Sequence, residues 1–162
     1  MARSKTLQIR LATAADLRAV YDIYGCSKLD ELRFEARSFV LLPLPDDARR
    51  HQALCEGELF IAEQGKHSLG FSSLHGAEIR GLFVHPEHRG RGIGRALLMH
   101  LLGLVPGEAR LYVALSNAPA RELYQRHGFA VVREFETEYN GVPVMAAEMR
   151  RPPCPHNTSS RP

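Results

Sequence analysis

A short run rich in glycine and arginine, "RGRGIGR" (89–95), is the stretch of the sequence best suited to bind an anion. Its glycines, Gly90, Gly92 and Gly94, can adopt a positive φ and let backbone N–H groups approach a ligand without an intervening Cβ. The apolar spacing that follows predicts a helix, whose first N–H groups lack intrahelical partners and whose dipole favours negative charge. The flanking arginines offer bidentate donors that suit phosphate: Arg89, Arg91 and Arg95. The turn therefore predicts a site for a phosphorylated ligand.

Two common nucleotide-binding templates do not fit this run. The sequence contains no G-x-x-x-x-G-K-[ST] string, and a G-x-G-x-x-G fingerprint starting at Gly90 would need glycine where Arg95 stands. A solvated turn without a ligand is the alternative, since glycine-rich turns are common. The position of the run, after three short predicted strands and at the start of a helix, favours pyrophosphate binding.

Hydrophobic periodicity predicts the elements that position this turn. Helical spacing or helix-boundary residues predict helices within 14–27, 46–57, 93–104 and 117–128. Short apolar or alternating runs predict strands at 7–13, 58–63, 69–74, 77–84, 109–115, 129–139 and 142–149. Asn140-Gly141 between the last two strands is the strongest two-residue hairpin signal in the chain. The order predicts a mixed α/β sheet interrupted by helices, whereas residues 27–57 show the weakest pattern.

Length and composition favour one domain over 1–150, followed by a Pro-, Ser- and Arg-rich tail over 151–162 that we expect to be disordered. The net charge of +3 is too small to indicate a nucleic-acid partner. No run approaches the roughly 18 apolar residues of a membrane span, and the N-terminal residues lack the apolar core of a signal peptide. We therefore expect a cytoplasmic protein without a membrane or nucleic-acid partner.

The three cysteines are Cys26, Cys55 and Cys154, an odd number without C-x-x-C spacing. This pattern argues against a disulfide framework and a zinc ribbon. We expect free thiols, with Cys26 and Cys55 acting as small core residues.

The residues around the turn resemble a known family. "RGRGIG" (89–94) matches the R/Q-x-x-G-x-G/A signature of the GNAT superfamily of acetyl-CoA-dependent N-acetyltransferases. "LFVHPEHRGRGIGRALL" (82–98) is similar to motif A of that superfamily, and "VALSNAPARELYQRHGF" (113–129) is similar to its motif B. The resemblance extends over nearly all of 7–149 and is poor over 27–57. It implies a mixed, mostly antiparallel sheet of about seven strands flanked by about four helices, splayed between the fourth and fifth strands.

The resemblance also implies acetyl-CoA as co-substrate, with no metal. Backbone groups of Leu82 and Val84 would pair with the pantetheine arm, and the N–H groups of 89–94 would hold the pyrophosphate. The full set of implied cofactor-binding residues is Leu82, Phe83, Val84, Arg89, Gly90, Arg91, Gly92, Ile93, Gly94, Arg95 and Asn117. Asn117 is also the expected N-cap of a helix, and the two roles are compatible.

Attack of an amine on a thioester needs a neutral nucleophile. An amine with a pKa near 10.4 is held neutral at pH 7 at a cost of roughly 4 to 5 kcal/mol, so a base assists. The resemblance implies Tyr124 as the acid that protonates the leaving thiolate and Glu78 as the base. A core tyrosine and an exposed strand glutamate are the alternatives. His85 and His88 have no third ligand nearby in the sequence, so we predict no metal site there.

The predicted activity is transfer of an acetyl group from acetyl-CoA to a primary amine by direct attack in a ternary complex. A non-catalytic acyl-CoA binder or sensor with the same fold is the alternative. The acceptor, a small molecule or a protein, stays open, as does a homodimer. The resemblance implies that residues 22–57 shape the acceptor site. Five acidic residues there are candidate partners of a cationic amine, with solvated surface acids as the alternative: Asp30, Glu31, Glu35, Asp46 and Asp47.

Overall fold

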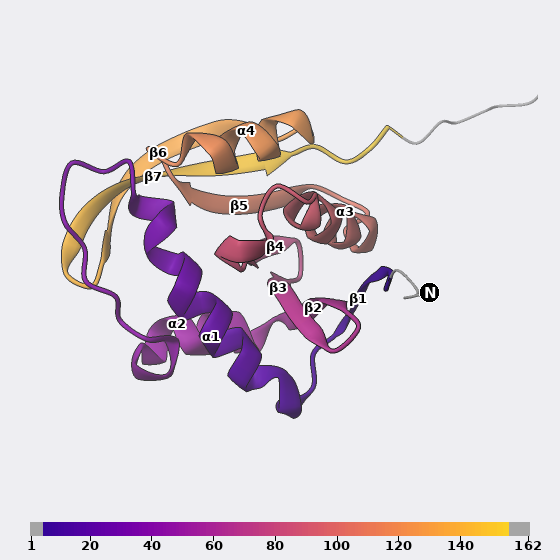
Figure 1. Ribbon diagram of the computed structural model, residues 1–162. Helices are drawn as coiled ribbons and strands as arrows, with labels where there is room; N and C mark the ends of the chain where they lie inside the picture. Colours follow the sequence, from indigo (N-terminus) through magenta and orange to yellow (C-terminus); the bar gives the residue numbers. More distant parts are fainter. Residues whose placement is uncertain (1–4, 156–162) are drawn as a thin grey trace, which may run out of the picture.

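In the computed structural model, which describes residues 5–155, seven strands form one sheet in the order β1-β2-β3-β4-β5-β7-β6 (Figure 1). All neighbouring strands pair antiparallel except β4 and β5, which are parallel. The strands are β1 (Leu7–Leu11), β2 (Glu58–Gln64), β3 (His67–His75), β4 (Glu78–Val84), β5 (Ala109–Ala114), β6 (Ala130–Tyr139) and β7 (Val142–Arg151). The predicted seven-stranded, mostly antiparallel sheet is confirmed.

Four α-helices cover the two faces of this sheet (Figure 1). They are α1 (Leu17–Ser27), α2 (Ala48–Glu56), α3 (Ile93–Leu104) and α4 (Ala118–Arg126). Helices α1 and α2 bury apolar side chains with Phe71 and Phe83 in one core cluster, while α3 and α4 pack over Leu111 and Met149 in another. Four 3-10 turns complete the chain: η1 (Ala14–Asp16), η2 (Lys28–Leu32), η3 (Leu44–Asp46) and η4 (Pro86–His88).

The strands β4 and β5 separate soon after they begin. They pair only at Glu78 with Arg110 and at Ile79 with Leu111, so the β5-facing edge of β4 is unpaired from Arg80 onward. A β-bulge accompanies the separation, because Ser73 and Leu74 of β3 pair with Gly81 and Ile79 and leave one extra residue on β4. The predicted splay between the fourth and fifth strands is confirmed.

Several local predictions differ from the structure. Residues 14–16 of the helix predicted within 14–27 form η1, and α1 begins at Leu17 and continues directly into η2. The segment 27–57 contains η2, η3 and α2, with no helix or strand over 33–43. All three cysteines are exposed, so the expectation that Cys26 and Cys55 belong to the core was wrong.

The turn of the last hairpin was predicted correctly, and the C-terminal end of its second strand was predicted only in part. Asn140 and Gly141 have φ values of 47° and 80°, as a two-residue turn of type I′ requires. Strand β7 continues to Arg151, one residue into the expected tail, and the Arg151 Nε–H donates to the His127 carbonyl oxygen at 2.9 Å. The expected disorder of 156–162 falls outside the described residues. Within 5–155, no helix is long and apolar enough to cross a membrane.

Candidate active site

A cleft of about 1300 Å³ lies in the splay between β4 and β5 and extends beneath α1 and α2. Twelve of the thirteen predicted site residues line this cleft, and the exception is the exposed Arg91. They come from β4, from the turn before α3 and the first turn of α3, and from the start and middle of α4. The separated strands thus bring together residues that the sequence places in two distant motifs.

The turn before α3 presents consecutive backbone donors to one end of the cleft. Gly90 and Gly92 have φ values of 75° and 77°, which strain any residue with a side chain. Gly92 is the N-cap of α3, and the first helical bond runs from the Ala96 N–H to the Gly92 carbonyl oxygen at 2.9 Å. The main-chain N–H groups of 90–95 donate no hydrogen bond to any residue in the described part of the chain. This cradle is suited to a diphosphate.

Gly94 differs from the other two glycines of the turn. It lies in the first turn of α3 without a positive φ, so the expected left-handed conformation does not apply there. A Cβ at Gly94 would lie 3.6 Å from Val84 Cγ2 and 4.0 Å from a Leu123 methyl group, which are ordinary contacts. Its lack of a side chain keeps the space between β4 and α4 open.

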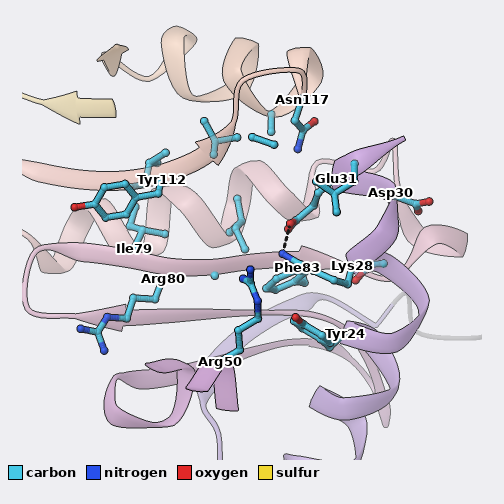
Figure 2. Close-up of a pocket in the computed structure, with 18 of the residues that line it drawn as sticks. Tyr24, Lys28, Asp30, Glu31, Arg50, Ile79, Arg80, Phe83, Tyr112 and Asn117 are labelled. Carbon is cyan, nitrogen blue, oxygen red and sulfur yellow. Dashed lines mark hydrogen bonds and ion pairs between the residues drawn. The ribbon is translucent and has the colours of Figure 1, made fainter. Parts of the chain in front are cut away.

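Asn117 and Tyr124 face the cleft from α4. Asn117 occupies the predicted N-cap position, but its side chain makes no capping hydrogen bond; Figure 2 shows its amide at the cleft. Tyr124 is 8% exposed and packs edge-on against Phe129. Burial raises the pKa of the Tyr124 hydroxyl, so it keeps its proton at neutral pH. Tyr124 therefore has the protonation state that an acid needs.

Glu78 lies at the closed end of the splay, where β4 and β5 still pair. Its carboxylate accepts hydrogen bonds from Arg80 Nε–H at 3.3 Å and from an Arg110 terminal N–H at 3.2 Å. Its side chain is 17% exposed and lines the cleft. Glu78 is thus half-buried and paired with two arginines.

The side of the cleft formed by α1, η2 and α2 contains residues that the sequence analysis did not single out (Figure 2). Lys28 is 7% exposed, and its Nζ lies 2.6 Å from a Glu31 carboxylate oxygen and 5.3 Å from the Tyr139 ring centroid. The guanidinium of Arg50 also stacks on the Tyr139 ring, with its central carbon 5.2 Å from the ring centroid. The four-residue spacing of Tyr24 and Lys28, which places them on one helical face, was the only local signal.

The acidic residues of 22–57 are mostly engaged by groups of the chain itself. Asp30 pairs with Arg89, Glu31 pairs with Lys28, and the Ser116 hydroxyl donates to Glu35 at 2.9 Å. Asp47 accepts the Arg50 backbone N–H at 3.1 Å and caps α2, whereas Asp46 is exposed and does not line the cleft. Four of the five candidates for an amine partner are thus already bonded.

The histidine turn also differs from expectation. Ligand atoms of His85, Glu87 and His88 lie within 4.8 Å of one another, so the reasoning that the histidines lack a third partner was wrong. However, the Glu87 backbone N–H donates to His85 Nδ1 at 3.2 Å, which uses this nitrogen to cap η4. This bond explains why the histidine precedes the turn without invoking an ion.

Comparisons with known proteins agree with this geometry. The family described as acetyltransferase (GNAT) domain matches residues 55–131. A peptidyl-lysine N-acetyltransferase of Salmonella typhimurium, YjaB, is 35% identical over 91 residues, which are 56% of this chain and 62% of that protein. The chain thus aligns with about three fifths of the length of this curated relative.

Solved structures share the fold over almost the whole chain. A GCN5-related N-acetyltransferase structure from Rhodopseudomonas palustris superimposes with a TM-score of 0.75 and 20% identity, over 94% of this chain and 99% of that one. A GNAT phosphinothricin acetyltransferase from Sinorhizobium meliloti in complex with acetyl-CoA gives a TM-score of 0.66 at 22% identity, over 97% and 93% of the two chains. At these identities the likeness concerns the fold.

Proposed function

We propose that the chain is a member of the GNAT superfamily and that it transfers the acetyl group of acetyl-CoA to a primary amine. The observation that carries the proposal is the continuity of two features along one edge of the cleft. The unpaired edge of β4 leads through η4 into the cradle of free N–H groups over 90–95. An extended arm ending in a diphosphate fits this succession, because the strand edge offers backbone pairing and the cradle offers anion donors.

Residues of the cleft fit the donor molecule without crowding it. A Cβ at Gly90 or Gly92 would meet nothing within 4 Å, so the space over the cradle is open. We assign backbone contacts with the pantetheine arm to 82–84 and contacts with the diphosphate to 89–95. Arg91, which is exposed outside the cleft lining, is assigned to the phosphate side through its backbone N–H. Asn117 is assigned to the cofactor as well, because its amide is not used as a helix cap.

The proposed reaction is direct transfer in a ternary complex. The amine nitrogen attacks the thioester carbonyl carbon, the C–S bond breaks, and the bonding electrons leave with the sulfur. Glu78 takes the proton of the amine, directly or through water, and Tyr124 donates a proton to the sulfur. A backbone N–H on the unpaired edge of β4 stabilises the developing charge on the carbonyl oxygen.

Calorimetry with acetyl-CoA and a thiol-release assay over a panel of amines test the proposal together. We expect binding of acetyl-CoA and acetylation of at least one amine, with the N-acetyl product identified by mass spectrometry. Binding without turnover of any amine would identify a non-catalytic acyl-CoA binder. Absence of both binding and turnover would refute the assignment of the cleft to acetyl-CoA.

A further inference from the structure

We propose that the acceptor amine carries a carboxylate near the amine and that Arg50 and Tyr24 bind this carboxylate. The inference rests on the proposed function, because it names the acceptor of the same cleft. It draws on the part of the cleft that residues of α1, η2, α2 and the end of β6 line.

Arg50 offers an unused guanidinium fork to the cleft. Its Nε lies 3.5 Å from an Asp47 carboxylate oxygen, and its side chain stacks against Tyr139. Its terminal nitrogens form no hydrogen bond with any residue of 5–155. Stacking and the Asp47 contact hold the fork in place, so little side-chain entropy is lost when it binds a partner. A planar fork with free N–H groups matches the two oxygens of a carboxylate.

The hydroxyl of Tyr24 is a second, independent indication that a ligand with a hydrogen-bond-accepting atom binds here. Its side chain lines the cleft and is 1% exposed, yet its hydroxyl has no hydrogen-bond partner among the described residues. A buried hydroxyl without a partner costs about 1 to 3 kcal/mol, so a ligand oxygen that accepts a hydrogen bond from it restores this energy. Burial raises the pKa of Tyr24 while Arg50 opposes the rise, which keeps the hydroxyl a donor and places Arg50 in its surroundings.

The ring of Tyr24 packs against β4, the strand that we assign to the pantetheine arm of acetyl-CoA. The Tyr24 ring lies 5.2 Å from the Phe83 ring, centroid to centroid, and Phe83 belongs to β4. The Lys28 Nζ lies 5.9 Å from the Tyr24 centroid and 6.0 Å from the Phe83 centroid. Figure 2 shows Tyr24, Lys28 and Arg50 grouped around Phe83. A carboxylate bound here lies beside the β4 edge where the thioester is proposed to react.

The charges of this group also suit the chemistry of the amine. Cations near an ammonium disfavour its protonated form and so lower its pKa. An acceptor with only an ammonium group meets repulsion from Arg50 and Lys28, and Glu31 is already paired with Lys28. An acceptor that also carries a carboxylate gains a partner for Arg50, which offsets this repulsion.

The test compares acceptors that differ only at the carboxylate. The twenty standard amino acids are screened, and the best is compared with its carboxamide and its decarboxylated amine. We expect kcat/KM for the acid to exceed both by about 10- to 100-fold, as loss of a hydrogen bond to a charged group implies. A peptide with Lys beside Asp is compared with the matched Lys-Asn peptide. A preference for the acidic member in either series supports the proposal, and the series that shows it identifies a free or a peptide-borne carboxylate.

Two variants test whether Arg50 and Tyr24 cause the preference for acceptors that carry a carboxylate. We expect Arg50→Gln to lower kcat/KM for the acid about 10- to 100-fold, and Tyr24→Phe about 10-fold, with the KM for acetyl-CoA unchanged in both. Tyr24→Phe removes only an unpartnered hydroxyl, so its melting temperature should equal or exceed that of the wild type. Arg18→Gln, on the exposed surface of α1 outside the cleft, is the matched control and should keep the wild-type preference.

Two outcomes separate this inference from the proposed function. Equal turnover of acid, carboxamide and amine would overturn the inference and leave the acetyltransferase proposal intact. If no amine is acetylated, calorimetry with N-acetylated amino acids in the presence of CoA decides. Binding that Arg50→Gln weakens supports the carboxylate site without the activity, and absence of binding overturns it.

Discussion

Arg89 of the phosphate-side turn forms an ion pair with Asp30 of η2, with a terminal nitrogen 2.7 Å from a carboxylate oxygen. The two residues are 59 positions apart in the chain and lie on different elements. Asp30 therefore places a negative charge beside the cradle that we assign to the diphosphate. The contact ties the donor end of the cleft to the segment that borders the acceptor.

Replacement of Asp30 by Asn should lower the KM for acetyl-CoA by up to about fivefold. An exposed ion pair contributes at most about 1 kcal/mol, and its loss leaves Arg89 free for the phosphates. Steady-state kinetics at low and high salt measure the effect, which should shrink as salt screens the charges. Asp22→Asn, at an exposed position of α1 outside the cleft, serves as control. A higher KM in Asp30→Asn would show that the pair supports donor binding.

Replacement of Gly92 by Val should raise the KM for acetyl-CoA by at least about tenfold, because a side chain at this φ distorts the cradle. Gly76→Val is the matched control, since Gly76 has a φ of 60° and open space around it in the β3–β4 turn. Both variants should lose similar thermal stability. A similar KM in the two variants would remove the pyrophosphate assignment.

Replacement of Tyr124 by Phe should lower kcat about 100-fold with little change in the KM for acetyl-CoA, as expected for loss of a general acid. The ring and its packing on Phe129 are kept, so the fold is preserved. Steady-state kinetics with the best acceptor provide the measurement. Tyr21→Phe, outside the cleft, controls for loss of a tyrosine hydroxyl. A kcat equal to that of the wild type would leave Tyr124 as a packing residue only.

Replacement of Glu78 by Gln should remove the acidic limb of the pH dependence of kcat/KM, because an amide cannot take the proton of the amine. The variant also breaks two ion pairs, so a control must separate the two effects. Arg110→Gln breaks one of these pairs and keeps the carboxylate, and its profile should retain the limb. An acidic limb in Glu78→Gln would assign the base to another group or to water.

Replacement of Asp16 by Asn should reduce the free energy of unfolding by about 1 to 3 kcal/mol at pH 7. Hydrogen bonds from Arg10 and from the Thr13 backbone N–H hold the pKa of Asp16 well below its ordinary value. Because the folded-state pKa is lowered, this stabilisation is present above the unfolded pKa near 4 and is lost as pH falls below it.

Urea unfolding at pH 7 and at pH 3 provides the measurement for Asp16. The difference between the variant and the wild type should be smaller at pH 3. Asp22→Asn, on the exposed surface of the following helix, should show no such pH dependence. An equal difference at both pH values would exclude ionisation of Asp16 as the cause.

The part of the cleft that we assign to the donor was predictable because its signals are local. The periods of the apolar residues define the strands and helices, and the glycines at 90 and 92 mark positions where the backbone needs a positive φ. Asn140-Gly141 likewise specifies its own turn. These features act over a few neighbouring residues, so the order of residues alone determines them.

The part of the cleft that we assign to the acceptor could not be predicted from the sequence, because contacts between distant residues form it. Tyr24, Lys28, Arg50 and Tyr139 come from α1, η2, α2 and β6. Tyr24 and Lys28 pack near Phe83 of β4, and Lys28 and Arg50 lie over the Tyr139 ring. Pairing of β4 with β5 likewise brings Arg110 to Glu78. Contacts between residues far apart in the chain depend on side-chain fit and on the entropy of closing long loops, neither of which has a local period. The sequence by itself therefore determined the fold and the cradle that we assign to the donor, and long-range packing determined which charges face the part of the cleft that we assign to the acceptor.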